Sequence, residues 1–105
     1  MGQKKLIKFA AIKEYENVLE YPQDMQGKWQ SFFQKQTGEA DRNAKLVLEL
    51  ACGRGEYAVG LGRLFPAQNF LGLDIKGNRI WKGASIANKD GLKNVGFVRT
   101  QIDQV

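Results

Sequence analysis

The sequence LVLELACGRG, at residues 46–55, decides the fold of this chain. Its apolar run contains an acid, Glu49, close to its end, and a glycine-rich loop follows. A second apolar run, NFLGL at 69–73, stands directly before another acid, Asp74. Acids and glycines in these places are typical of a nucleotide-type cofactor site at the carboxyl ends of two parallel strands. The sequence therefore predicts a cofactor-binding module.

Strand and helix patterns alternate around this stretch. We expect strands at 45–50, 69–75 and 95–99, with helices between them at 56–65 and 77–89. The order β-α-β-α-β implies an α/β fold with a parallel sheet and right-handed crossovers. The first strand is almost continuously apolar, as expected of a strand that is covered on both faces.

Both predicted helices carry residues that can face a core. In the first helix the large apolar candidates are Tyr57, Leu61 and Leu64. Small residues of the same helix would permit a close approach to the sheet: Ala58, Gly60 and Gly62. The second helix is expected to end at Gly91, and one of its faces is small or apolar: Ile80, Gly83, Ala84 and Ala87.

The first 44 residues read as helical or irregular and show no strand pattern, although segment 17–22 looks extended. Residues 27–36 carry an aromatic stripe at helical spacing, which indicates core packing. Gly38 is expected to stop that helix. We therefore predict an N-terminal extension, residues 1–44, ahead of the α/β part, residues 45–105.

Composition limits the class of protein. The 105 residues form at most one domain, and a hydrophobic content of 43% allows a modest core. The single cysteine, Cys52, excludes an internal disulfide and has no nearby base to activate it, which indicates a packed loop residue. Without histidine, Cys/His zinc sites and histidine-based catalysis are excluded, and we expect no metal. Neither a bilayer-spanning run nor a signal peptide is visible, which predicts a cytoplasmic protein, and the net charge of +5 favours polyanionic partners.

Each of the two acids can be interpreted in two ways. Glu49 would repel a pyrophosphate, which disfavours a dinucleotide although Ala58 fits that glycine pattern, and it suits a cofactor with a cationic amino group. Alternatively, Glu49 acts as a cap or pairs with Lys45 or Arg54. Asp74 can accept hydrogen bonds from both hydroxyls of a ribose, or it begins a turn. The combination of both acids with the glycine loop favours cofactor binding.

Several motifs together resemble one family. The pattern Glu-x-Ala-x-Gly-x-Gly at 49–55, followed by Asp74, is similar to the first two motifs of class I S-adenosylmethionine-dependent methyltransferases. The segments GKW at 27–29, LFP at 64–66 and GLKNV at 91–95 narrow the match. Nearly the whole chain resembles the tRNA (guanine-N(7)-)-methyltransferase family.

The resemblance implies a partial Rossmann-like methyltransferase fold, in which residues 45–105 form the N-terminal half of the S-adenosylmethionine-binding domain. It also implies methylation of nitrogen seven of a guanine in tRNA. The residues carried over for the cofactor are Glu49, Ala51, Gly53, Gly55, Asp74, Ile75, Gln101 and Ile102. The family usually has an acid at the position of Gln101, where it contacts the adenine. Charge placement adds a candidate surface for tRNA phosphates: Lys4, Lys5, Lys8, Arg54, Lys76 and Arg79.

Family members continue through further strands, one of which bears a Phe-Pro-Asp-Pro-type motif with the acid assigned to the target guanine. That motif does not occur in these 105 residues, so we expect the catalytic residues after Val105. The third strand would then leave a raw sheet edge, and uncovered apolar surface predicts self-association. Two alternatives stay open: a non-catalytic cofactor-binding fragment, and a class I methyltransferase with another substrate.

Overall fold

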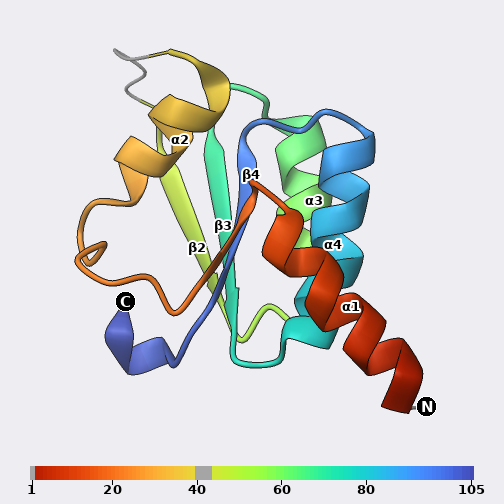
Figure 1. Ribbon diagram of the computed structural model, residues 1–105. Coiled ribbons are helices and arrows are strands. Elements are labelled where there is room, and N and C mark those ends of the chain that lie inside the picture. The colour runs from red at the N-terminus through yellow and green to blue at the C-terminus, as the bar shows by residue number, and fades with distance from the viewer. Residues whose placement is uncertain (1, 40–43) are drawn as a thin grey trace.

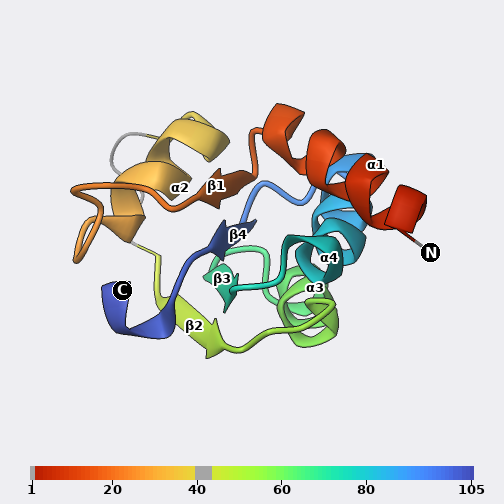
Figure 2. The ribbon, with the colours of Figure 1, turned by 60° about the horizontal axis from the view of Figure 1, so that its bottom comes forward.

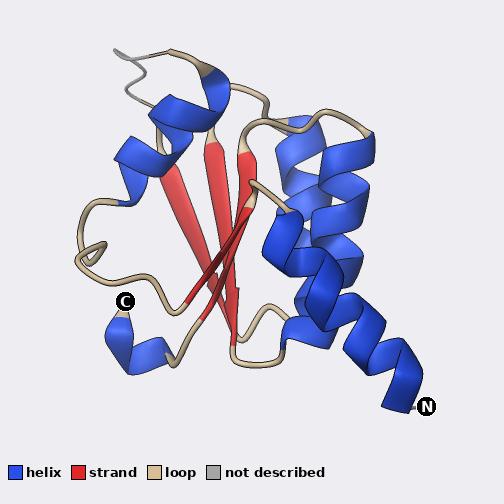
Figure 3. Ribbon diagram, in the orientation of Figure 1, coloured by secondary structure: helices blue, strands red, loops and turns tan. Residues whose placement is uncertain are grey.

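The computed structural model describes residues 2–39 and 44–105, and the side chains of residues 2–4 and 104 are not part of that description. It shows an α/β fold in which helices flank a single sheet (Figures 1 and 3). In chain order the elements are α1 (Gly2–Glu14), β1 (Val18–Glu20), α2 (Trp29–Thr37), β2 (Leu46–Leu50), α3 (Glu56–Leu64), β3 (Asn69–Asp74), α4 (Gly77–Lys89) and β4 (Val95–Arg99). A 3-10 turn, Ile102–Gln104, follows β4.

The four strands are all parallel and lie in the order β1-β4-β3-β2. The predicted β-α-β-α-β unit is therefore confirmed as β2-α3-β3-α4-β4. Helices α1, α3 and α4 lie on one face of the sheet, and α2 lies on the other (Figure 2). This arrangement gathers the carboxyl ends of all four strands at one edge of the sheet, where the glycine loop begins.

The N-terminal segment contributes the strand β1, which lies within segment 17–22 that was expected to be extended, although no strand pattern marked it. Phe97 donates its amide to the Asn17 carbonyl at 2.8 Å, and Tyr21 donates to the Arg99 carbonyl at 2.7 Å. Beyond the amino end of β1, the Gln36 side chain of α2 takes the place of a strand amide. It donates a hydrogen bond to the Val95 carbonyl of β4 at 2.9 Å. The expectation of a raw edge at β4 is wrong, because β1 pairs with it. The division of the chain into an N-terminal extension, residues 1–44, and half of a cofactor-binding domain, residues 45–105, stays a prediction.

Two cores lie on the two faces of the sheet. The larger, under α1, α3 and α4, includes Phe97 and Ile80, which are both completely buried. The smaller, under α2, includes Phe33 and Leu73. Complete burial of a side chain of this size stabilises the fold by roughly 1.5–3 kcal/mol. The predicted aromatic stripe of α2 therefore packs as expected, and Gly38 ends that helix with a left-handed φ of 76°.

The strand covered on both faces is β3, in which every residue is buried, rather than β2. On β2, Leu48 is 41% exposed and Leu50 is 54% exposed. The expectation for β2 was wrong because this strand lies at the sheet edge and α2 packs over β3 and β4 instead. Apolar composition therefore identified the strand but not its burial.

The core face of α4 was predicted correctly, and that of α3 in part, because Leu61 packs against the larger core whereas Tyr57 and Leu64 do not. All four predicted residues of α4 are buried. On α3 the buried residues are Ala58, Val59 and Gly62, whereas Tyr57 is 73% exposed and Leu64 is 72% exposed. A Cβ on Gly62 would overlap a methyl group of Val95 in β4, so this glycine does permit a close approach. The small residues turn α3 toward the sheet and leave Tyr57 and Leu64 in solvent, and Gly60 faces open space.

Candidate functional site

The glycine loop joins β2 to α3 and has an unusual backbone. Ala51, Gly53 and Gly55 have φ values of 54°, 59° and 72°, all in the left-handed region. That region costs nothing to glycine and is unfavourable for alanine. Gly55 also lacks room for a side chain, because a Cβ there would overlap the Phe97 ring. Backbone conformation and packing therefore explain both predicted glycines of the loop.

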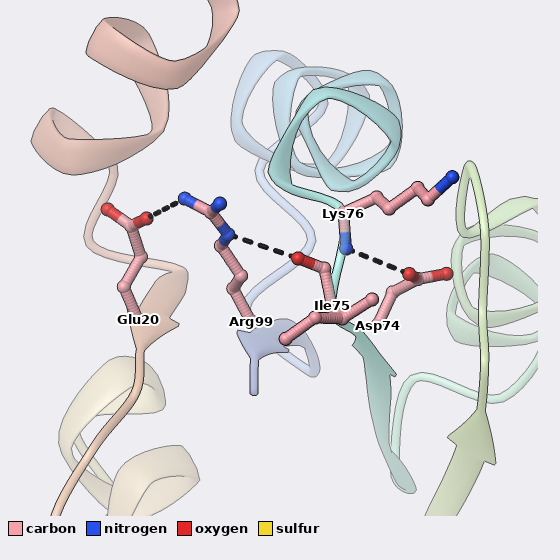
Figure 4. Close-up of polar contacts among 5 residues, drawn as sticks. All are labelled: Glu20, Asp74, Ile75, Lys76 and Arg99. Carbon is pink, nitrogen blue, oxygen red and sulfur yellow. Dashed lines mark hydrogen bonds and ion pairs between the residues drawn. The ribbon is translucent and has the colours of Figure 1, made fainter. Parts of the chain in front are cut away.

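Asp74 fastens this loop to the end of β3. Its Oδ2 accepts a hydrogen bond from the Gly53 amide at 2.8 Å, and its Oδ1 accepts one from the Lys76 amide at 2.9 Å (Figure 4). The second bond joins the Asp74 side chain to the amide two residues later and so closes a turn over residues 74–76. The interpretation that Asp74 begins a turn is therefore correct. A carboxylate oxygen has two lone pairs, and each oxygen therefore keeps one acceptor site. The residue is only 7% exposed, which holds those sites in a fixed direction.

Glu49 lies on the face of β2 that is turned toward α3. Its Oε1 is buried and has no hydrogen-bond partner among the described residues. Burial raises the pKa of this carboxyl group, and the nearby Ala58 amide opposes that rise. In the described part of the chain, no ion pair joins Glu49 to Lys45 or Arg54. The structure thus leaves a desolvated carboxyl group beside the glycine loop without a cationic partner.

Cys52 is a packed residue of the same loop, as predicted. Its amide donates to the Leu73 carbonyl of β3 at 2.8 Å, and its side chain is buried in the larger core. Burial, followed by the negative charges of Asp74 and Glu49, raises the pKa of the Cys52 thiol to about 12. A thiol with that pKa stays protonated at neutral pH and is a poor nucleophile.

The remaining predicted cofactor residues lie at the same edge of the sheet. Ile75 follows β3 and is 41% exposed, and Ile102 follows β4 and is 45% exposed. The exposed Gln101 lies between β4 and the 3-10 turn. An open hollow beside the loop brings together Glu49, Ala51, Cys52, Arg54, Glu56 and Tyr57, whereas Asp74 and the residues after β4 are not in its lining.

Comparison with known proteins shows which family this chain belongs to. The family model described as "Putative methyltransferase" matches residues 43–105, which is more than half of the chain. This chain belongs to that methyltransferase family. A methyltransferase requires a methyl donor, and residues 43–105 contain both acids and the glycine loop described above.

Relatives of this methyltransferase chain carry a more specific name. It is 49% identical, over 98% of its length, to the tRNA (guanine-N(7)-)-methyltransferase of Bacteroides thetaiotaomicron, of which it covers 42%. Proteins of the same name from Christiangramia forsetii and Cytophaga hutchinsonii are 42% and 38% identical over its whole length, and it covers 48% and 46% of them. The chain therefore spans a little under half the length of these relatives.

The basic residues predicted for tRNA lie around the same edge of the methyltransferase sheet. Lys5 is exposed on α1, while Arg54, Lys76 and Arg79 are exposed on the glycine loop and on or next to α4. α1 lies beside α4 (Figures 1 and 2), and Lys8 of α1 places its ammonium 5.0 Å from the centre of the Trp81 ring on α4. The side chain of Lys4 lies outside the described part of the chain. The two helices therefore bring most of these charges to neighbouring surfaces.

Two residues at this edge escaped the sequence analysis. Asp103 is an exposed acid in the turn after β4, two residues beyond Gln101, and its position near an expected acid was the signal that could have found it. Arg99, the last residue of β4, contacts β1, α1 and the turn after β3. No motif marks it in the sequence.

The described residues of this methyltransferase chain contain neither a candidate membrane span nor a candidate metal site. No helix within residues 2–39 and 44–105 has both the length and the apolar character needed to cross a bilayer. The same residues do not gather three or more cysteine or acidic side chains in an arrangement that could hold a metal ion.

Proposed function

We propose that this chain is the cofactor-binding half of an enzyme that transfers a methyl group from S-adenosylmethionine to nitrogen seven of a guanine in tRNA. The observation that carries the proposal is the pair of acids on either side of the glycine loop. Glu49 offers a buried carboxyl oxygen without a partner, and Asp74 fastens the loop while keeping acceptor sites. The names of the relatives support the choice of tRNA as substrate.

The chemistry of the site fits S-adenosylmethionine. The Glu49 carboxyl group, whose Oε1 has no hydrogen-bond partner among the described residues, suits the ammonium group of the methionine part, because a cation would compensate its desolvation. The remaining lone pairs of Asp74 suit the two ribose hydroxyls. Gly53 and Gly55, with Ala51, would line the cofactor, and Ile75 with Ile102 would form an apolar wall near the adenine. Gln101 can accept from or donate to the adenine edge, and the exposed Asp103 is a second candidate for that contact.

Bound S-adenosylmethionine supplies a methyl group on a positively charged sulfur. Nitrogen seven of guanine carries a lone pair, so its attack on that methyl group requires no strong base. The role proposed for this chain is therefore positioning, in which the acids and the loop hold the methyl donor in line with the incoming nitrogen. The residues that hold the guanine are expected outside these 105 residues. Lys4, Lys5, Lys8, Arg54, Lys76 and Arg79 would contact tRNA phosphates, and this substrate would place the enzyme in the cytoplasm.

Isothermal titration with S-adenosylhomocysteine tests the cofactor part of the proposal. Glu49→Gln should weaken binding by about tenfold or more, because a charge-assisted contact of the ammonium group is lost. The matched control is Glu16→Gln, since Glu16 is an exposed acid just before β1, at the opposite edge of the sheet from the glycine loop. Equal affinity of both variants and the original chain would refute the role of Glu49. Tighter binding of a nicotinamide dinucleotide than of S-adenosylhomocysteine would refute the choice of cofactor.

Methylation of tRNA by the longer protein tests the substrate. We expect S-adenosylmethionine-dependent formation of 7-methylguanine in tRNA, with affinity for tRNA that falls as salt rises. Joint replacement of Lys76 and Arg79 by glutamine should weaken tRNA binding and reduce its salt dependence. Methylation of a small molecule or a protein but not of tRNA would replace this substrate by the alternative stated above.

A further inference from the structure

Arg99, the last residue of β4, contacts three other parts of the chain. Its Nη1 donates to Glu20 Oε2 of β1 at 2.8 Å, and its Nε donates to the Ile75 carbonyl at 3.2 Å (Figure 4). Its guanidinium carbon also lies 4.6 Å from the centre of the Phe9 ring of α1 and 5.5 Å from that of Tyr21. Charge-assisted bonds and stacking on aromatic rings both restrict a guanidinium group. Arg99 is therefore held from the side of the N-terminal segment.

The contact with Ile75 reaches the cofactor site through a single rigid unit. The carbonyl of Ile75 and the amide of Lys76 belong to the same planar peptide group. That amide donates to Asp74 Oδ1, and Asp74 Oδ2 accepts from the Gly53 amide of the glycine loop. Fixing the carbonyl side of this plane therefore fixes the direction of the amide that orients the Asp74 carboxylate.

These contacts form one continuous series across the sheet. It runs from β1 through β4 and the turn after β3 to the loop after β2, which is the order of the strands in the sheet. Figure 4 shows the series from Glu20 through Arg99 and the Ile75–Lys76 peptide to Asp74, with the side chain of Lys76 extending away from Arg99. The N-terminal segment, which contains no residue predicted to touch the cofactor, is connected in this way to a residue that is.

We propose that Arg99 is a positioning residue for the cofactor site. It orients the Asp74 carboxylate and the glycine loop through the Ile75–Lys76 peptide plane, and Glu20 holds Arg99 in place from β1. This inference rests on the proposed function, in which Asp74 binds the ribose of S-adenosylmethionine. It predicts that the N-terminal segment influences cofactor affinity without contacting the cofactor.

Two variants test this role, and each removes a different link. Arg99→Lys keeps a positive charge near Glu20 but loses the Nε–H that reaches Ile75, because an ammonium group lacks the fork of a guanidinium. Glu20→Gln leaves Arg99 in the chain and removes the carboxylate that holds it. The control is Arg63→Lys, which alters an exposed ion pair with Asp90 away from the site. Urea unfolding first establishes that each variant is folded at the temperature of the binding measurement.

Two readouts separate positioning from a merely structural role. The first is the amide resonances of Gly53 and Lys76 in ¹⁵N–¹H spectra of the chain without ligand, and the second is the Kd for S-adenosylhomocysteine. We expect Arg99→Lys and Glu20→Gln to shift both resonances and to weaken binding about fivefold or more, the lower range of measured couplings between sites. Arg63→Lys should change neither.

The outcomes distinguish this inference from the proposed function. Unchanged Gly53 and Lys76 resonances in the folded Arg99→Lys variant would overturn the positioning role, and so would shifted resonances with an unchanged Kd. If the original chain did not bind S-adenosylhomocysteine, the proposed function would fail and the cofactor role of Arg99 with it. The resonances would in that case still decide whether Arg99 sets the geometry of the loop.

Discussion

Substitution of the two loop glycines by alanine should have clearly different effects on stability. Gly53 and Gly55 both have left-handed φ values, 59° and 72°, which cost an alanine about 1–2 kcal/mol. A Cβ on Gly53 meets no atom within 4 Å, whereas one on Gly55 would overlap the Phe97 ring. Forcing atoms into a packed site costs about 1–3 kcal/mol more. The reduced entropy of the unfolded chain offsets about 0.4–1 kcal/mol of these costs, so we expect Gly53→Ala to lower the free energy of unfolding by about 0.5–1 kcal/mol and Gly55→Ala by about 1.5–4 kcal/mol.

Urea unfolding at equilibrium measures this difference directly. The entropy that alanine removes from the unfolded chain is the same at both positions, so it cancels when the two variants are compared. Ala51, with a φ of 54°, provides a reverse test, since Ala51→Gly removes a strained backbone. That variant should gain about 0.5–1 kcal/mol after the entropy term is subtracted. Equal decreases in the free energy of unfolding for Gly53→Ala and Gly55→Ala would refute the claim that the Phe97 ring leaves no room for a side chain at Gly55.

Two further predictions concern ionisable groups of the site. The pKa of Cys52 is raised to about 12, so iodoacetamide should label the folded chain at pH 8.5 about 100-fold or more slowly than the chain in denaturant, with a Cys52→Ser variant as the unlabelled control. Equal labelling rates would show that the thiol is accessible and ionised. The pKa of Glu49 is raised above its ordinary value of 4.5, so the folded state binds the proton more tightly and loses stability as pH rises through this range. Glu49→Gln should therefore be more stable than the original chain at pH 7 without ligand, with the gap closing below pH 4.5 in urea titrations; a constant gap would contradict this.

The central part of the fold could be predicted from sequence because its signals are local. The apolar runs that became β2, β3 and β4 are bounded by acids, glycines and a proline, and the structure places these strands within one residue of the predicted ends. Asp74 could be singled out for the same reason, since an acid at a strand end is visible without knowledge of tertiary contacts. The structure added that this carboxylate fastens the glycine loop, which connects residues distant in sequence.

The sequence-based predictions were wrong or incomplete where tertiary contacts determine the structure. Periodicity identified α3 but not its orientation, because the close approach of Gly62 to Val95 turns the small residues inward and exposes Tyr57. The strand β1 has only three residues, too few to show a pattern, and it exists because β4 offers a free edge. Arg99 carries no motif, since its partners come from three separate parts of the chain.

The pairing of β1 with β4 has a consequence for how the chain folds as it is synthesised. Val18 leaves the ribosome early, yet its partner in the sheet is Phe97. At roughly 5–20 residues per second, about 4–16 seconds separate the synthesis of these two residues. During that interval β2 and β3 can pair, whereas β1 has no partner strand until β4 has been synthesised. Pairing of β1 with β4 therefore closes a long loop late in synthesis, and we expect this step to be slow.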